Sequence, residues 1–337
     1  MSAGPELSAL LADAGFESPV TALTPLSGGW NHRVCALDLP DQRLLLKQYR
    51  PDPQGGFPRL EQEWCFSVYL QQQYPGHSPR PLACDPAQGL ALFEWISGER
   101  FRPEQLTLAD TDAAVAFIAA IQSDTPAARA LPPAAEFCRS LSDHLHHLEA
   151  RLQRLAAIEA LSEVHRQAQT WIAHELLPCA REALQRIRTQ LQRQPGLDRP
   201  LTAFELWLSP SDFGFHNALN TPAGPVFLDF EYAGYDDPVQ LIADFCAQFE
   251  VPAPLGSAAR FTLLLRALSP DPDWQLERLT LVTPIHRLKW VGIALNHFCP
   301  SGRRAFSGTL NPEQLECQLR KAQQLLQTGQ NHCDSLQ

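Results

Sequence analysis

The first hundred residues alternate short apolar runs with turns. The runs VCALDLP and RLLLKQY, over residues 34–40 and 43–49, flank the turn Pro40-Asp41-Gln42 and predict a β-hairpin. Apolar positions then recur at helical spacing, which predicts a helix over residues 61–73. The run GLALFEWISGE, residues 89–99, is typical of a strand that continues into an extended connector. The pattern therefore predicts a β-rich segment that contains one helix.

Helical spacing dominates after residue 103. Thr107 followed by Asp110 is a capping-box pattern and predicts a helix through Ile121. Residues 134–194 are also predicted to be mainly helical, and a β-rich island follows over residues 201–232. The triplet Asn311-Pro312-Glu313 reads as the cap and first turn of a last helix.

These patterns predict two lobes of unequal size. Residues 1–97 form the small β-rich lobe, and residues 98–337 form a larger, mainly helical lobe with one β-rich loop region. The chain has 337 residues, 45% of them hydrophobic and 19% charged, which suits a globular protein with a full core. The net charge of -10 and the absence of a Lys/Arg block argue against a nucleic-acid partner.

Cysteine usage and the opening of the chain bear on its compartment. Nine cysteines are an odd count, and no pair forms a C-x-x-C, so a zinc site or a disulfide framework is not indicated. The first residues lack the basic start and hydrophobic run of a secretory signal. No segment approaches the roughly 20 apolar residues that cross a bilayer. We expect a cytoplasmic protein with reduced thiols and no membrane partner.

The stretch from Trp207 to Pro238 carries the most chemical information. Asp212 and Asn217 form the pattern D-x-x-x-x-N, and Asp229 follows the apolar run VFL. The TPAG segment between them predicts a hairpin turn that brings Asn217 and Asp229 to one end. One carboxylate can accept a hydrogen bond from an acceptor hydroxyl, while a second carboxylate and an amide oxygen hold a hard cation. These residue types are the ones that phosphoryl transfer requires.

A second set of candidate residues lies near the start of the chain. Gly28 and Gly29 occupy a turn between strands, where backbone N–H groups can approach phosphate oxygens. Lys47 is one of three lysines in the chain and lies among apolar neighbours. A lysine that reaches phosphates needs an acidic partner. The following helix offers Glu61 and Glu63, and we favour Glu63 because the apolar side of the helix then faces the sheet.

At these residues the sequence resembles the aminoglycoside phosphotransferase and choline kinase-like superfamily, which shares its fold with protein kinases. The resemblance runs from about Leu26 to Phe249. It implies an α+β, protein-kinase-like two-lobed fold. It further implies that Asp212 is the catalytic base and that Asn217 and Asp229 bind Mg²⁺.

The resemblance also implies a site for ATP. Lys47 would contact the α- and β-phosphates and pair with Glu63. Backbone groups near Glu94, Trp95 and Ile96 would form the hinge that receives adenine.

The sequence departs from the family pattern in two places. Pro210 and Ser211 stand where the family usually has His-Gly before its catalytic Asp, and Gln240 replaces an acid that follows the Asp-Pro pair. These departures leave open a nucleotide-binding pseudokinase or interaction module without turnover. A helical scaffold with an incidental hairpin is a third reading.

The short spacing after Asp229 indicates a small acceptor. Asp236-Asp237-Pro238 follow within a few residues, which leaves no room for the long activation segment of a protein kinase. We expect a small-molecule hydroxyl acceptor such as a sugar, an amino sugar or an amino alcohol. Glu231, Asp236 and Asp237 are candidates to attract a cationic group on it.

Histidines along the chain also invite a metal reading. His144, His146 and His147 include no pair spaced four apart and no accompanying glutamate base. We expect these three side chains on a solvated helix face.

Overall fold

The protein is described by a computed structural model that covers residues 4–26, 31–50, 57–122, 125–299 and 310–334. Contacts along the chain group it into two compact units. The sheet unit comprises Met1–Ala135 and Leu208–Tyr235, and the helical unit comprises Glu136–Trp207 and Asp236–Gln337. The predicted division into lobes of residues 1–97 and 98–337 stays a prediction.

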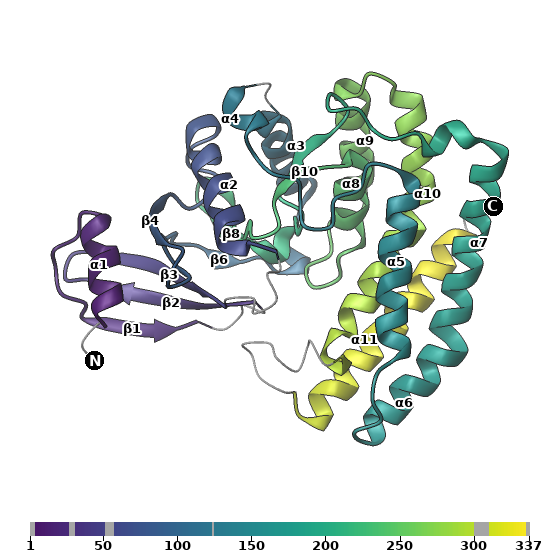
Figure 1. Cartoon of the computed structure of the whole chain (residues 1–337), viewed down its shortest axis with the longest axis horizontal. Helices are drawn as coiled ribbons and strands as arrows, with labels where there is room; N and C mark the ends of the chain where they lie inside the picture. Colours follow the sequence, from purple (N-terminus) through teal and green to yellow (C-terminus); the bar gives the residue numbers. More distant parts are fainter. Residues whose placement is uncertain (1–3, 27–30, 51–56, 123–124, 300–309, 335–337) are drawn as a thin grey trace. The chain divides into compact units, whose positions relative to one another are not determined.

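The sheet unit is built on a five-stranded antiparallel sheet (Figure 1). In spatial order its strands are β1 (Ala22–Pro25), β2 (His32–Asp38), β3 (Arg43–Tyr49), β5 (Leu90–Glu94) and β4 (Pro81–Asp85). The predicted hairpin is confirmed as β2 and β3, with Asp38 paired opposite Arg43. Its turn is closed by the Leu39 N–H, which donates to the Gln42 carbonyl at 2.8 Å.

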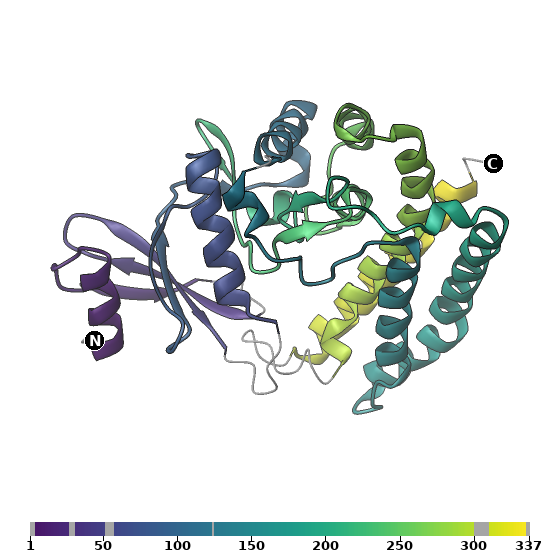
Figure 2. The same cartoon turned by 45° about the horizontal axis from the view of Figure 1, so that its top comes forward.

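Alternation along β3 decides which side chains face which helix. Leu44 and Leu46 point to one face, where they pack in a cluster with α1 (Pro5–Asp13). Tyr49 points to the other face, which packs against α2 (Arg59–Gln73) (Figure 1 and Figure 2). Because side chains alternate with a period of two, Lys47 shares the face of Tyr49 and is directed toward α2.

The remaining elements of the sheet unit include two smaller sheets and two helices. The predicted capping box is confirmed at α3 (Leu108–Ile121), where the Thr107 N–H donates to Asp110 Oδ2 at 2.8 Å. The other elements are α4 (Pro126–Arg129), β6 (Glu99–Arg100), β7 (Trp207–Ser209), β8 (Ala218–Thr221), β9 (Gly224–Phe227) and β10 (Gly234–Asp236). Strands β6, β8 and β9 form a three-stranded antiparallel sheet, and β7 pairs with β10.

The connector after β5 depends on a glycine. A Cβ atom at Gly98 would lie 2.9 Å from the backbone oxygen of Asn220 in β8. A larger residue would therefore push β6 away from β8, the strand that follows Asn217.

The helical unit contains the predicted long helical region and the last helix. Its helices are α5 (Leu141–Ala156), α6 (Glu163–Trp171), a π-helical turn (Ile172–Leu176), α7 (Leu177–Arg193), α8 (Pro238–Ala247), α9 (Ser257–Leu268), α10 (Pro272–Ala294) and α11 (Pro312–Asp334). Residues 134–140 are not helical, because Ser140 caps α5 in a capping box with Asp143. Within the part of the chain that is described, no helix is long and apolar enough to span a membrane.

Polar side chains of α5, α8 and α10 form a buried chain of contacts. His144 Nε2 lies 3.1 Å from Asp237 Oδ2, and His144 Nδ1 lies 3.1 Å from His286 Nε2. His286 Nδ1 continues the chain to Asp244 Oδ1 at 2.7 Å. The expectation of a solvated histidine face is therefore wrong for His144, because its ring has buried polar partners.

Candidate active site

Asp212 lies in a loop that leaves β7. Ser211, just before it, has a φ of 66°, a left-handed conformation that glycine adopts most readily. The Ser211 N–H donates to Ser209 Oγ at 3.0 Å, and Ser211 Oγ donates to the Tyr232 carbonyl at 2.8 Å. Ser211 thus adopts a backbone conformation that suits the glycine usual at this position in the family. Its side chain adds the hydrogen bond to the Tyr232 carbonyl, which we call the tether. This departure from the family pattern is compatible with an ordered loop.

Asp212 is held by two neighbours on the short 3₁₀ turn Phe215–Asn217. His216 Nε2 lies 3.0 Å from Asp212 Oδ1, and Asn217 Nδ2 donates to Asp212 Oδ2 at 3.1 Å. Asn217 Nδ2 also donates to the Asp212 carbonyl at 3.0 Å. The Asp212 side chain is 39% exposed, so a molecule from solvent can reach it. Because Asn217 donates through its nitrogen, its amide oxygen is the atom suited to a cation.

The predicted hairpin brings Asn217 and Asp229 to the same end. Ala218 in β8 pairs with Phe227 in β9, so both candidate residues lie just beyond the paired ends. The Leu228 N–H donates to the Asn217 carbonyl at 2.8 Å, which extends the pairing toward the site. Asp229 itself has a φ of 66°, an uncommon conformation for a residue with a side chain.

Lys47 joins this end of the hairpin to α2. Its Nζ lies 2.6 Å from Glu63 Oε1 and 3.0 Å from Asp229 Oδ1. Tyr49 donates a hydrogen bond from its hydroxyl to the other oxygen of Glu63. Glu63 is therefore the acidic partner of Lys47, whereas Glu61 is exposed.

The charges of Lys47 and Asp229 support one another. Burial alone would raise the pKa of Asp229, but Lys47 and His32 outweigh it and lower this pKa to about 2. Burial opposes the charge on Lys47 as well, yet Asp229 and Glu63 together raise its pKa above the ordinary value. Both side chains are therefore charged at neutral pH.

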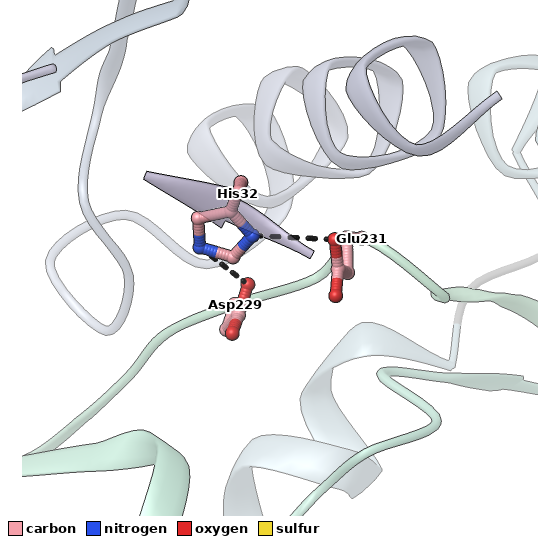
Figure 3. A group of neighbouring side chains, drawn as sticks. All are labelled: His32, Asp229 and Glu231. Atoms are coloured by element: carbon pink, nitrogen blue, oxygen red, sulfur yellow. Dashed lines mark hydrogen bonds and ion pairs between the residues drawn. The ribbon is translucent and has the colours of Figure 1, made fainter. Parts of the chain in front are cut away.

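Two further residues lie beside Asp229. His32 was not predicted as a site residue, and Glu231 was predicted only as an acid that attracts a cationic acceptor. His32 Nε2 lies 3.6 Å from Asp229 Oδ1, and its Nδ1 lies 3.3 Å from Glu231 Oε2 (Figure 3). Burial lowers the pKa of His32, but the two carboxylates outweigh burial and Lys47, and the pKa lies above 6.5. The hairpin register was the available signal, because it places His32 opposite Tyr49 and hence on the face of Lys47.

The acids proposed to attract a cationic acceptor are all engaged elsewhere. Glu231 accepts a hydrogen bond from Asn31 at 2.7 Å. In the helical unit, Asp236 accepts one from Gln240 at 2.6 Å, and Asp237 pairs with Arg278. All three acids are buried, which argues against this role for them.

The expected nucleotide contacts are described in part. Glu94 ends β5, and its N–H donates to the Arg80 carbonyl at 2.9 Å. Ile96 lies half-buried in the connector that follows. Gly28 and Gly29 lie outside the described residues.

The donor atoms fit a hard cation better than a transition metal. Asn217 offers an amide oxygen and Asp229 a charged carboxylate, the ligand types that Mg²⁺ prefers. One ligand atom each from His32, Asp229 and Glu231 lies within 4.8 Å of the others, which is close enough for a metal. However, each ring nitrogen of His32 contacts a different carboxylate (Figure 3), an arrangement typical of hydrogen bonding.

Comparisons with known proteins bear on the family and the fold of the chain. A model of the phosphotransferase enzyme family matches residues 22–275. A candidate aminoglycoside phosphotransferase from Ralstonia eutropha JMP134 has a TM-score of 0.63 at 13% identity, with 99% of each chain covered. A spectinomycin phosphotransferase in complex with ADP and spectinomycin has a TM-score of 0.63 at 8% identity, covering 96% of this chain and 98% of that one.

A choline/ethanolamine kinase family protein from Mesorhizobium loti has a TM-score of 0.56 at 18% identity, covering 95% of this chain and 92% of that one. No curated protein matches the chain in sequence. The structural likenesses confirm the predicted α+β, protein-kinase-like fold, with a small antiparallel sheet and a mainly helical C-terminal region. The resemblance to the aminoglycoside phosphotransferase and choline kinase-like superfamily is also confirmed. From the match over most of its length, the chain belongs to the phosphotransferase enzyme family.

Proposed function

We propose that the protein transfers the γ-phosphate of ATP to a hydroxyl group of a small molecule, with Mg²⁺ as cofactor. The observation that carries this proposal is the pair of contacts from Lys47 Nζ to Glu63 and Asp229. Such a lysine, fixed by an acid beside a cation-binding carboxylate, is suited to hold nucleotide phosphates. The ADP in the similar spectinomycin phosphotransferase supports a nucleotide as donor.

In this proposal each residue has one task. Lys47 holds the α- and β-phosphates, and Glu63 fixes the lysine. Asn217 and Asp229 would hold Mg²⁺, which neutralises phosphate charge when bound. Asp212 accepts a hydrogen bond from the acceptor hydroxyl, orients it toward the γ-phosphate and takes its proton.

The nucleotide would be bound mainly by the N-terminal lobe, residues 1–97. Backbone groups at Glu94 and Ile96 would receive adenine, and the turn at Gly28 and Gly29 would cover the phosphates. The acceptor would be a sugar, an amino sugar or an amino alcohol. Support for this class comes from similar structures whose names include spectinomycin and choline or ethanolamine.

The proposal is tested by replacing the base. In Asp212→Asn the fold is kept and the proton acceptor is lost, so we expect kcat to fall by about 100-fold or more. Phosphoryl transfer from labelled ATP is measured on a panel of sugars, amino sugars and amino alcohols. Asp41→Asn, in the exposed turn between β2 and β3, is the matched control and is expected to leave kcat unchanged.

An Asp212→Asn enzyme with the wild-type rate would remove Asp212 as the base. A wild type that binds Mg²⁺ and ATP tightly, yet phosphorylates no member of the panel, would favour a nucleotide-binding module. The tether from Ser211 to Tyr232 supports the active enzyme, because it orders the loop that carries Asp212.

A further inference from the structure

Two carboxylates, one half-buried and one buried, stand side by side just beyond the end of the β8–β9 hairpin. Asp229 and Glu231 are separated by Phe230, whose ring is buried and lies 5.3 Å from that of Phe66. With Phe230 anchored in the core, both carboxylates are directed to the same neighbourhood, around His32 (Figure 3). One carboxylate oxygen of each lies within 4.8 Å of the other. Two negative charges this close repel unless a group between them compensates.

His32 is placed to be that group. Its side chain is 2% exposed, and each of its ring nitrogens faces one of the two carboxylates. Across the hairpin it lies opposite Tyr49, with ring centroids 5.3 Å apart. Glu231 is in turn fixed from its other oxygen by Asn31 Nδ2 at 2.7 Å. The imidazole is therefore confined between partners on three sides.

Lys47 and His32 approach the same oxygen of Asp229. Lys47 Nζ and His32 Nε2 both approach Oδ1, at 3.0 and 3.6 Å. The Asp229 side chain is 28% exposed, so it keeps access to a cation from solvent. A second cation held by His32 itself would lie close to the Lys47 ammonium, which disfavours direct metal binding by the ring.

We infer that His32 is a positioning residue that bridges Asp229 and Glu231 and thereby orients Asp229 toward the metal ion. This inference rests on the proposed function, because it assigns His32 a task in the metal site of that reaction. It acts through Asp229 and touches neither nucleotide nor acceptor. The uncommon left-handed backbone of Asp229 is consistent with a residue whose position is fixed by its surroundings.

The test measures metal affinity with a spectroscopic probe. Mn²⁺ is titrated into the protein with the non-hydrolysable analogue AMP-PNP, and free Mn²⁺ is followed by electron paramagnetic resonance. In His32→Phe the ring contact with Tyr49 is kept and both nitrogens are lost. We expect Mn²⁺ affinity to fall about 10-fold or more, as for other groups that orient metal ligands.

Two further variants show whether a change in Mn²⁺ affinity is specific to the nitrogens of His32. His32→Gln keeps an N–H donor for one carboxylate, so its Mn²⁺ affinity is expected between those of wild type and His32→Phe. His77→Phe is a matched control, because His77 stacks on Tyr74 in the same unit and has no place in the proposed site. Metal-free AMP-PNP affinity should stay within about twofold in all variants, because Lys47 is retained.

Each outcome has a separate meaning. A wild-type protein that binds no Mn²⁺ with AMP-PNP contradicts the proposed function itself. A wild type that binds Mn²⁺, with His32→Phe binding equally well, overturns only the role of His32. Electron spin-echo spectra of the unaltered protein should show no directly bound histidine nitrogen on Mn²⁺, and a strong nitrogen coupling would show a histidine ligand and contradict the inference. This last measurement needs no variant and holds even if the substitutions prevent folding.

Discussion

Glu61 and Glu63 show how helical periodicity selects which acid of a helix can pair with a lysine on the facing strand. The sequence favoured Glu63 from helical spacing, and the structure pairs it with Lys47. That choice was predictable because strand and helix periods fix which faces meet. The contribution of His32 was harder to see, since it depends on Asp229 and Glu231, which are remote in the sequence.

The pair of glutamates provides a matched test at this scale. Glu63→Gln removes a charge from a buried pair and leaves Lys47 with less compensation, so we expect a loss of about 3 kcal/mol in the free energy of unfolding. We also expect a raised KM for ATP. Glu61→Gln changes an exposed acid of the same helix and should alter neither quantity. Urea denaturation and initial rates measure both, and equal effects of the two variants would contradict the assigned pairing.

At the scale of elements, most helices and strands followed from periodicity and turn chemistry. The hairpin of β2 and β3, the capped start of α3 and the cap of α11 lie where the sequence indicated. Helix α1 was missed, although Leu7, Leu10 and Leu11 have helical spacing and are buried. The buried position of His144 could not be predicted, because its partners lie on α8 and α10.

The buried histidine of α5 predicts how stability changes with pH. Burial lowers the pKa of His144 to about 4, although Asp237 raises it. The unfolded chain, with an ordinary histidine pKa near 6.5, binds more protons between these values, so stability falls as the pH drops from about 6.5 to 4. The loss is about 3 kcal/mol. The pKa of Asp244 also lies below its ordinary value, because His286 and Lys289 outweigh burial, and it adds a loss below about pH 4.

Urea unfolding at pH 7, 5.5 and 4.5 measures this dependence. In His144→Gln the titrating group is absent, and the slope of stability against pH between 6.5 and 4.5 should become shallower. His146→Gln, on the exposed side of the same helix, should keep the wild-type slope. The same slope in wild type and His144→Gln would show that His144 does not govern it.

For the whole molecule, the order of helices and strands along the chain was more predictable than which compact unit each segment joins. Residues 208–235 follow the long helical region in sequence, yet they belong to the sheet unit. That membership comes from long-range pairing, such as that of β6 with β8. Composition and periodicity report local structure, and therefore they do not reveal which distant segments pair.

Binding of nucleotide and metal should be visible as a property of the entire chain. With ATP and Mg²⁺ at about 100 times their dissociation constant, mass action predicts about 2.7 kcal/mol of added stability. Thermal melting should therefore shift upward with Mg²⁺ and ATP together, and chelation by EDTA should remove most of the shift. The shift should be smaller in Lys47→Met. Equal shifts with and without the chelator would argue against a cation at Asn217 and Asp229.

The tether from Ser211 has a consequence for substitutions at position 232. Ser211 Oγ donates to the main-chain carbonyl of Tyr232, not to its side chain. Substitution of the tyrosine would therefore leave the anchor of the Asp212 loop in place. The tyrosine hydroxyl itself accepts a hydrogen bond from Asn31 Nδ2 at 2.5 Å, so its loss would be felt at Glu231, which the same amide contacts, and not at Asp212.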